Sequence, residues 1–322
     1  MSSDKEKTST ATPETEQGDA APQAVVASPQ VVMGPLVQAL QQALSRVESA
    51  AGESDTTEMV HGARKALKEY RALLRLVGGD VAATARRETA ATARELAHAR
   101  DRATALEALE MLRQAGFARE DDLAAAGEAI GADQADEREH ESMHRLLHQF
   151  LVDARQALSS GLEAKANAVD LVDGLRRGYR AARKAELTTP EAMHEVRKRV
   201  VTHRYQMSFV ADWFSGKGAK RAARAQRLRD VLGAYQDIET LRPLLHSVGS
   251  ELEDGVIARL ERAMARLQKR LGKQAHKRHA ALFRRSSRSF ARRLGALDTP
   301  VSPLAERTAQ TWKVLPLEEG GE

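Results

Sequence analysis

Apolar side chains recur every three to four positions through almost the whole stretch from residue 35 to residue 295, which is the period of an amphipathic helix. Glycines and Pro190 interrupt this period and mark the helix ends. Together they predict helices over residues 35–51, 56–77, 80–115, 119–130, 134–159, 161–186, 190–214, 217–247 and 250–295. No stretch alternates as a strand does, so the sequence predicts an all-α fold.

The predicted helix over residues 56–77 has an unusual polar face. With 100° per residue, five basic or near-basic side chains lie within about 80° of one another, opposite the apolar face that holds Leu67 and Leu74. We call these five residues the first stripe: His61, Arg64, Lys68, Arg71 and Arg75. A solvated face normally mixes both signs, because like charges at helical spacing repel. A single stripe of this kind is more often a solvated face than a surface that binds an anion, so the interpretation depends on whether further stripes accompany it.

The first stripe belongs to a pattern that occurs twice in the chain. Its two copies are His61-x-x-Arg64-Lys65 with Asp101, and His194-x-x-Arg197-Lys198 with Asp237. The histidine and the aspartate are 40 residues apart in the first copy and 43 apart in the second. This repeat predicts two stacked halves, about residues 31–160 and 161–298, related by a pseudo-twofold axis. The basic faces of the halves could then confront each other.

Three further stripes of basic side chains follow the same logic. The second stripe comprises His194, Arg197, Lys198 and Arg204, and Val201 occupies the angle that Lys68 has in the first stripe. The third stripe comprises Arg176, Arg180, Arg183 and Lys184, and the fourth comprises Lys217, Lys220, Arg221 and Arg224. We predict that the four stripes, together with Lys65, line one cavity.

Composition narrows the class of protein. The 322 residues are 42% hydrophobic and include no cysteine, which excludes disulfides, cysteine-ligated zinc, iron–sulfur clusters and thiol catalysis. The net charge is only +5, but residues 171–300 hold 29 Lys and Arg against 13 Asp and Glu, whereas residues 31–170 hold 17 against 23. Basic charge that is concentrated in this way indicates a polyanionic partner.

The two ends of the chain differ from its middle. Residues 1–30 and 299–322 have few large apolar side chains, so they are predicted to be disordered tails on either side of one helical domain over residues 31–298. No window approaches 18 uncharged apolar residues, and the first residues lack the apolar core of a secretory signal. We therefore expect a soluble cytoplasmic protein without a membrane segment.

One short motif suggests metal chemistry. His140-Glu141-Ser142-Met143-His144 has the H-E-x-x-H spacing that places two histidines on one face of a helix, and Glu163 follows as a possible third ligand. Charged residues flank the motif on both sides, whereas the site helix of a zinc peptidase is usually apolar. We therefore expect no metal site and no cofactor, while incidental binding of metal by His140, His144 and His148 stays open.

Four separated motifs give the chain a resemblance to a known family. His61 to Arg71 is similar to the His-x-x-Arg-Lys-x-x-Lys-x-x-Arg pattern of the CHAD family, the conserved histidine α-helical domain. The family's other motifs resemble HEVRKRVVTHRY at 194–205, LRRGYRAARKA at 175–185 and RLRDVLGAYQDIETL at 227–241. The resemblance spans about residues 40–295. It implies two related four-helix halves and a basic groove or channel that binds inorganic polyphosphate.

The resemblance also bears on enzymatic activity. Some CHAD domains accompany a triphosphate-tunnel domain with a Glu-x-Glu-x-Lys strand, and this chain has no such segment. It therefore resembles the stand-alone type, which implies binding without catalysis. We expect polyphosphate to bind the stripe residues and to recruit the protein to polyphosphate granules, where other granule-associated proteins are possible partners. The alternatives are a general polyanion or nucleic-acid binder, possibly associated with the nucleoid, and a metal-dependent enzyme.

Two further expectations concern the basic residues. Beside arginine in an empty site, the pKa of His61 and His194 is expected to fall below about 6.5, and bound phosphate is expected to raise it, so binding should tighten at mildly acidic pH. The basic segment HKRH at 276–279, with arginine pairs at 284–285 and 292–293, is either an outer face that contacts a long polyanion or simply solvated charge.

Overall fold

The computed structural model of the protein describes residues 34–96, 101–131, 137–211 and 217–294. All regular structure in these ranges is helical, which confirms the all-α prediction. The helices are α1 (Pro35–Ala51), α2 (Thr56–Val77), α3 (Gly79–Glu95), α4 (Asp101–Gln114), α5 (Glu120–Gly131), α6 (Glu137–Ala157), α7 (Glu163–Asn167), α8 (Leu171–Arg183), α9 (Pro190–Phe209), α10 (Lys217–Ser247), α11 (Val256–Leu282) and α12 (Ser287–Leu294). The predicted tails, residues 1–30 and 299–322, lie outside the described residues.

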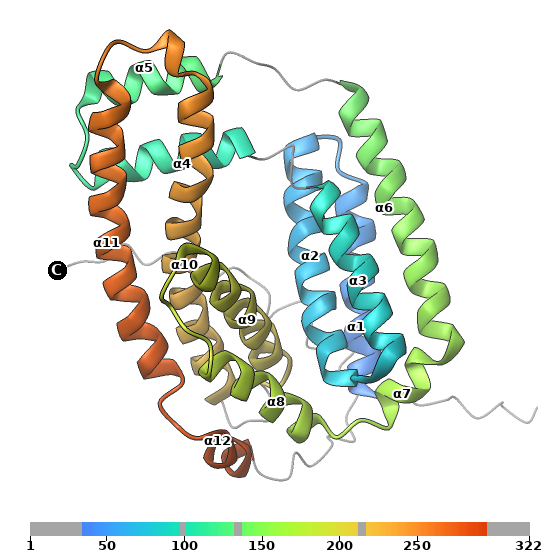
Figure 1. The fold of residues 1–322 in the computed structure, drawn as a ribbon. Helices are drawn as coiled ribbons and strands as arrows, with labels where there is room; N and C mark the ends of the chain where they lie inside the picture. Colours follow the sequence, from blue (N-terminus) through green and yellow to red (C-terminus); the bar gives the residue numbers. More distant parts are fainter. Residues whose placement is uncertain (1–33, 97–100, 132–136, 212–216, 295–322) are drawn as a thin grey trace, which may run out of the picture. The chain divides into compact units, whose positions relative to one another are not determined.

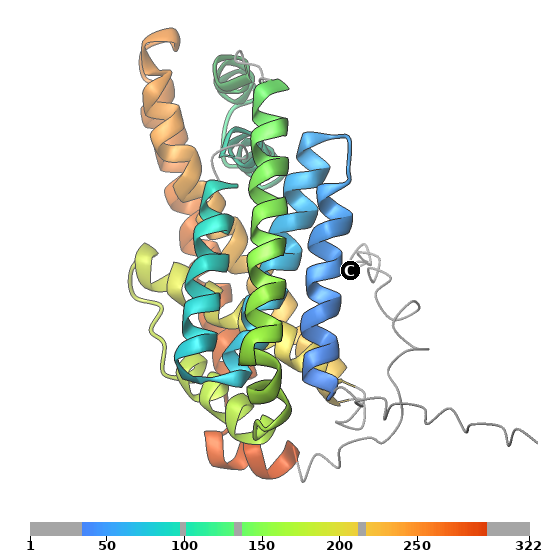
Figure 2. The same cartoon turned by 90° about the vertical axis from the view of Figure 1, so that its right-hand side faces the viewer.

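Helices α1, α2, α3 and α6 form one four-helix group. Each packs against two neighbours in the order α1, α2, α3, α6 and back to α1, and Figures 1 and 2 both show them side by side. The apolar face predicted for residues 56–77 supplies the centre of this group, because Leu67, Tyr70 and Leu74 are fully buried. The polar face that holds the first stripe is thereby left outside the core of the group.

A second group forms around α10, the longest helix. Helix α10 packs against α9 and α11, α8 packs against α9, and α12 packs against α8. Helices α4 and α5 belong to the predicted first half, yet α4 makes extensive contacts with α10, and α5 contacts α11 (Figure 1). The division into two repeated halves at about residue 160 stays a prediction.

Helices α2 and α9, which contain the two copies of the His-x-x-Arg-Lys pattern, are in direct contact. The Tyr205 hydroxyl donates to the carbonyl of Lys65 at 3.1 Å, and the buried Gln206 amide donates to the carbonyl of Ala72 at 3.0 Å. Helix α8 also lies close to α2, because a Cβ atom at Gly174 would come within 3.2 Å of the Leu76 carbonyl oxygen. The structure therefore brings the first and second stripes onto neighbouring helices.

The helix ends were predicted well where glycine or proline marks them. The bounds predicted for residues 35–51, 56–77 and 217–247 agree with α1, α2 and α10. Thr189 caps α9 as its position before Pro190 indicates, with its hydroxyl accepting from the Ala192 amide at 3.2 Å.

Three predicted helices are interrupted where polar side chains bond to the backbone. The predicted helix over 80–115 ends at Glu95, and the next carbonyl, that of Leu96, accepts from Arg64 at 3.1 Å. Within 161–186, the Asp170 carboxylate caps α8 by accepting from the Asp173 amide. The predicted helix over 250–295 starts only after Gly255 and breaks before α12, where the Ser286 hydroxyl accepts from the Ser289 amide.

Candidate anion-binding site

The second half of the first stripe lies beside arginines of α3. Arg71 and Arg75 point from α2, and Arg86 is held over the end of α2 by a 3.4 Å bond from its Nη1 to the Leu74 carbonyl. Burial lowers the pKa of Arg71 from its ordinary value, and Arg75, Arg94 and Arg86 lower it further. Burial, followed by Arg75, likewise lowers the pKa of Arg86. These guanidinium groups are therefore close enough to repel one another.

Helix α9 adds another arginine to this group. The Nη1 of Arg199 donates to the carbonyl of Ala181 on α8 at 2.8 Å, which fixes its place. Partial burial lowers the pKa of Arg75, the positive charge of Arg199 lowers it further, and the carboxylate of Glu195 raises it. Glu195 also forms a 2.7 Å ion pair with Lys198 of the second stripe. We call the group of five arginines from three helices the arginine cluster: Arg71, Arg75, Arg86, Arg94 and Arg199.

The arginine cluster is a favourable place for an anion. Positive charges held close together repel one another, and solvent screens this repulsion less at the half-buried Arg71 and Arg86 than at the exposed Arg75, Arg94 and Arg199. The carboxylate of Glu195 raises the pKa of Arg75, and the same carboxylate also forms an ion pair with Lys198. An oxyanion between the guanidinium groups would relieve the repulsion through charged hydrogen bonds.

Sequence reasoning found only two members of the arginine cluster. Arg86 and Arg94 lie in the segment ARRETAATARE, where Glu88 and Glu95 interrupt the positive charge. Arg199 lies about 140° around α9 from His194 and therefore falls outside the second stripe. A search for faces of one sign misses residues of this kind, because the cluster forms between helices rather than along one of them.

The first half of the first stripe borders the end of α3. Arg64 donates to the Leu96 carbonyl, Lys68 is half-buried, and His61 is exposed. Lys65 is also exposed, while its carbonyl accepts the bond from Tyr205. Residues 97–100, which complete the first copy of the repeat before Asp101, lie outside the described residues.

The second stripe lies against α10 at the equivalent place in the repeat. His194 bonds through Nδ1 to the Gln236 side-chain oxygen at 3.0 Å, and Arg197 packs over Gly233, where a Cβ atom would lie 3.8 Å from two guanidinium nitrogens. Burial lowers the pKa of His194, and the charge of Lys198 lowers it further. Arg204 covers the ring of Tyr205, with its guanidinium carbon 4.0 Å from the ring centroid.

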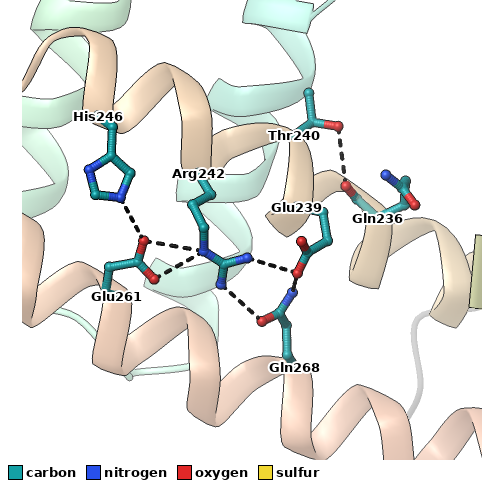
Figure 3. A network of polar contacts seen from close by, with 7 residues as sticks. All are labelled: Gln236, Glu239, Thr240, Arg242, His246, Glu261 and Gln268. Atoms are coloured by element: carbon teal, nitrogen blue, oxygen red, sulfur yellow. Dashed lines mark hydrogen bonds and ion pairs between the residues drawn. The ribbon is translucent and has the colours of Figure 1, made fainter. Parts of the chain in front are cut away.

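A polar network further along α10 fixes this helix to α11 (Figure 3). Arg242 binds Glu239 at 2.9 Å and Glu261 at 3.1 Å, and it also donates to Gln268. His246 contacts Glu261 from the other side at 3.1 Å. Both carboxylates are therefore engaged by Arg242.

The third and fourth stripes have mixed surroundings. Arg176 pairs with Asp173 at 2.6 Å, and Arg177 binds the same carboxylate. Arg221 is half-buried, donates to the Leu282 carbonyl at 3.0 Å and lies over the rings of Tyr179 and Phe290. The remaining members of the two stripes are exposed: Arg180, Arg183, Lys184, Lys217, Lys220 and Arg224. The prediction that four stripes line one cavity stays a prediction.

The H-E-x-x-H segment, residues 140–144, lies in the first turns of α6, where side chains are described from His140 onward. His140 is already bonded through Nδ1 to the Thr56 hydroxyl at 2.8 Å. Within the ranges that the structure describes, no three His, Asp or Glu side chains are grouped as a metal site would require.

The fold and the site together define an all-α protein in which two His-x-x-Arg-Lys helices pack against each other beside a cluster of arginines. The model of the CHAD domain family matches residues 36–246, and the chain belongs to this family. Helices α11 and α12 lie beyond the end of the match, although the sequence resemblance was expected to continue to about residue 295. No curated protein and no solved structure matches the chain.

Membership of the family indicates a general class of function. CHAD domains are associated with polyphosphate binding and are generally non-catalytic. In the part of the chain that the structure describes, no helix is both long and apolar enough to cross a membrane.

Proposed function

We propose that the protein binds inorganic polyphosphate at the arginine cluster without turning it over. The observation that carries the proposal is the approach of five arginines from three helices, namely Arg71, Arg75, Arg86, Arg94 and Arg199. Burial, and after it the charge of neighbouring arginines, lowers the pKa of Arg71, Arg75 and Arg86. Such an arrangement is unfavourable by itself and becomes favourable when an anion lies between the charges. The basic residues of the first stripe continue the positive surface along α2.

The chemistry of polyphosphate suits this arrangement. The chain has about one negative charge per phosphate and no bases, so a protein needs no aromatic platform to hold it. Arginine binds two oxygens of one phosphate through its planar fork, and lysine adds a point charge. Carbonyl groups hold Arg64, Arg86 and Arg199 in place. These three side chains therefore lose less conformational entropy when phosphate binds.

The absence of bases in the ligand also separates polyphosphate from nucleic acid. Binding of single strands relies on stacking of bases on aromatic side chains, and only 4% of this chain is aromatic. In the described residues the buried rings of Tyr70, Tyr179 and Phe290 belong to the core. We propose that nucleic acid binds more weakly than polyphosphate at the same phosphate concentration.

A competition experiment tests the proposal. Labelled duplex DNA is bound to the full chain at low salt, and long polyphosphate is added at matched phosphate concentration while fluorescence anisotropy is followed. We expect polyphosphate to displace the DNA, and we expect the variant R71Q/R75Q to bind polyphosphate about 100-fold more weakly. The control variant R145E/K165E changes two exposed residues of α6 and α7 and should bind normally. Failure of polyphosphate to displace DNA would favour a general polyanion binder.

Turnover is tested separately. Incubation with polyphosphate and Mg²⁺, Mn²⁺ or Zn²⁺ should release no orthophosphate, whereas metal-dependent release would identify an enzyme. We further propose that polyphosphate recruits the protein to granules in the cytoplasm. A fluorescent fusion should form foci only in cells that contain polyphosphate, and the R71Q/R75Q fusion should remain diffuse.

A further inference from the structure

A cavity of about 270 Å³ lies where the corner between α4 and α5 meets α11. Arginines dominate its lining, which includes Phe117, Arg119, Asp122, Arg259, Arg262 and Arg266. The carboxylate of Asp122 is buried and receives two bonds from Arg259, at 2.9 Å and 2.8 Å. Asp122 therefore holds Arg259 in place and neutralises one of the four arginines of the lining.

The other charges around this cavity leave it positive. Arg119 has a loose contact of 3.9 Å with Asp121. Arg262 and Arg266 form no ion pair with a carboxylate among the described residues. Arg266 and Arg270 lie over Phe117, at about 5 Å from the ring centroid to each guanidinium carbon. Phe117 thus supports the two guanidinium groups and is not available for stacking on a base.

The positive surface continues along α11 from this cavity. Six exposed side chains lie within about 100° of one another on the helix and span about 22 Å along its axis. We call them the α11 stripe: Arg262, Arg266, Lys269, Arg270, Lys273 and Lys277. Glu261 is the one acidic residue of α11, and it faces α10, where it binds Arg242 and His246. The stripe is therefore of one sign.

We propose that the cavity and the α11 stripe form a second phosphate-binding surface, which holds another segment of the same polyphosphate chain. This inference rests on the proposed function and adds a contact on α11, beyond the residues that the CHAD model matches, to the corner between α4 and α5, which lies within them. Condensed phosphate fits because tetrahedral oxyanions suit a cavity lined by arginines, and a linear chain suits a helical stripe. Single-stranded nucleic acid fits less well, because arginine covers Phe117 and leaves no free aromatic face for a base to stack on.

Two contacts for one chain change how affinity depends on chain length. Once one segment of a long chain is held at the arginine cluster, the second contact becomes intramolecular and gains from a high effective concentration. A chain of three phosphates is too short to follow the α11 stripe, so it gains nothing from this surface. Long polyphosphate should therefore bind much more tightly than tripolyphosphate.

The variant R262E/K273E tests the second surface. It reverses two exposed charges of α11 and leaves Arg266 and Arg270 on Phe117. Binding of tripolyphosphate and of a chain of about 100 phosphates is measured on the full protein, with R145E/K165E as the charge-matched control and circular dichroism as the check of folding. We expect the affinity for the long chain to fall about tenfold and that for tripolyphosphate to change less than twofold.

The outcomes separate this inference from the proposed function. Unchanged affinity of R262E/K273E for the long chain, with R71Q/R75Q losing binding, overturns the second surface alone. Loss in R262E/K273E with normal binding by R71Q/R75Q refutes the arginine cluster and makes α11 the primary site. A larger loss for duplex DNA than for polyphosphate, at equal phosphate concentration, overturns the assignment of α11 to condensed phosphate.

Discussion

Helices α2 and α9 contain the same His-x-x-Arg-Lys pattern and have different charge environments. In α2, Arg71 and Arg75 lie beside further arginines of α3 and α9. In α9, Lys198 is paired with Glu195, Arg204 covers an aromatic ring, and Val201 replaces the lysine that α2 has at this angle. The repeat therefore preserves the position of the histidine and arginine, while positive charge is concentrated on the α2 side.

The two helices also differ in the core. Nine residues after the histidine of the pattern, α2 has Tyr70 and α9 has His203, and both side chains are buried. His203 lies among Tyr179, Phe283 and Phe290. Histidine ordinarily titrates near pH 6.5 and tyrosine near pH 10, so the two helices should respond differently to mildly acidic pH as well as to phosphate.

Two double variants, one that removes two arginines of α2 and one that removes two arginines of α9, should separate the roles of the two helices in binding. Each charged hydrogen bond to phosphate contributes about 1.5–3 kcal/mol, so we expect R71Q/R75Q to weaken polyphosphate binding about 100-fold. R197Q/R204Q should weaken it only about tenfold, since Arg204 is engaged with Tyr205. Isothermal titration at fixed salt measures both. Equal losses would show that the repeat is symmetric in function.

His203 should make folding stability depend on pH. Burial lowers its pKa from 6.5 to about 3, so between these values the unfolded chain binds a proton that the folded chain does not. The free energy of unfolding is therefore unaffected by His203 above pH 6.5 and decreases as the pH falls below it. At pH 5 the protonation of His203 in the unfolded chain lowers this free energy by about 2 kcal/mol. Urea unfolding of H203F should show a shallower acid slope, whereas the control Y70F should retain the slope of the wild type.

Glu195 should weaken binding by neutralising part of the positive surface. Its carboxylate pairs with Lys198 and acts on Arg75, so E195Q should tighten polyphosphate binding about threefold, as expected for one exposed ion pair. The variant E186Q changes an exposed carboxylate near the end of α8 and provides the control. If the two variants bind alike, Glu195 has no specific effect on the site.

The two motif histidines should differ in the pH dependence of binding. The pKa of the half-buried His194 is lowered by burial, by Lys198 and by Arg197, while Gln236 and Glu195 raise it. Phosphate bound nearby should raise this pKa, so binding takes up a proton and tightens, about threefold from pH 8 to pH 6. H194Q should flatten this dependence more than H61Q, because His61 is exposed. Identical pH profiles for the three proteins would exclude His194 from the charge change.

Much of the fold followed from local sequence signals. The helical spacing of apolar side chains, with glycine or proline at the helix ends, predicted α1, α2 and α10 with the correct bounds. The ends at Leu96, Asp170 and Ser286 were not predicted, because they depend on side-chain bonds to the backbone. At Leu96 the donor is Arg64, 32 residues away, and a local pattern does not show a contact over that distance.

The candidate site was predictable only in part. Arg71 and Arg75 were found because they lie on a face of one sign, and this signal acts within a single helix. Arg86, Arg94 and Arg199 joined them through the packing of α3 and α9 against α2, which brings together residues from mixed faces. A prediction that considers the charges of one helix at a time therefore underestimates the positive charge of the arginine cluster.

The junction of α2 and α9 has a consequence for how such proteins diverge. Tyr205 and Gln206 bond to main-chain carbonyls of Lys65 and Ala72, and a carbonyl is present whichever residue occupies these positions. The docking of α9 therefore makes little demand on the side chains of the basic face of α2. Lineages of this fold can alter their ligand preference by substitution along that face while the two helices keep their register.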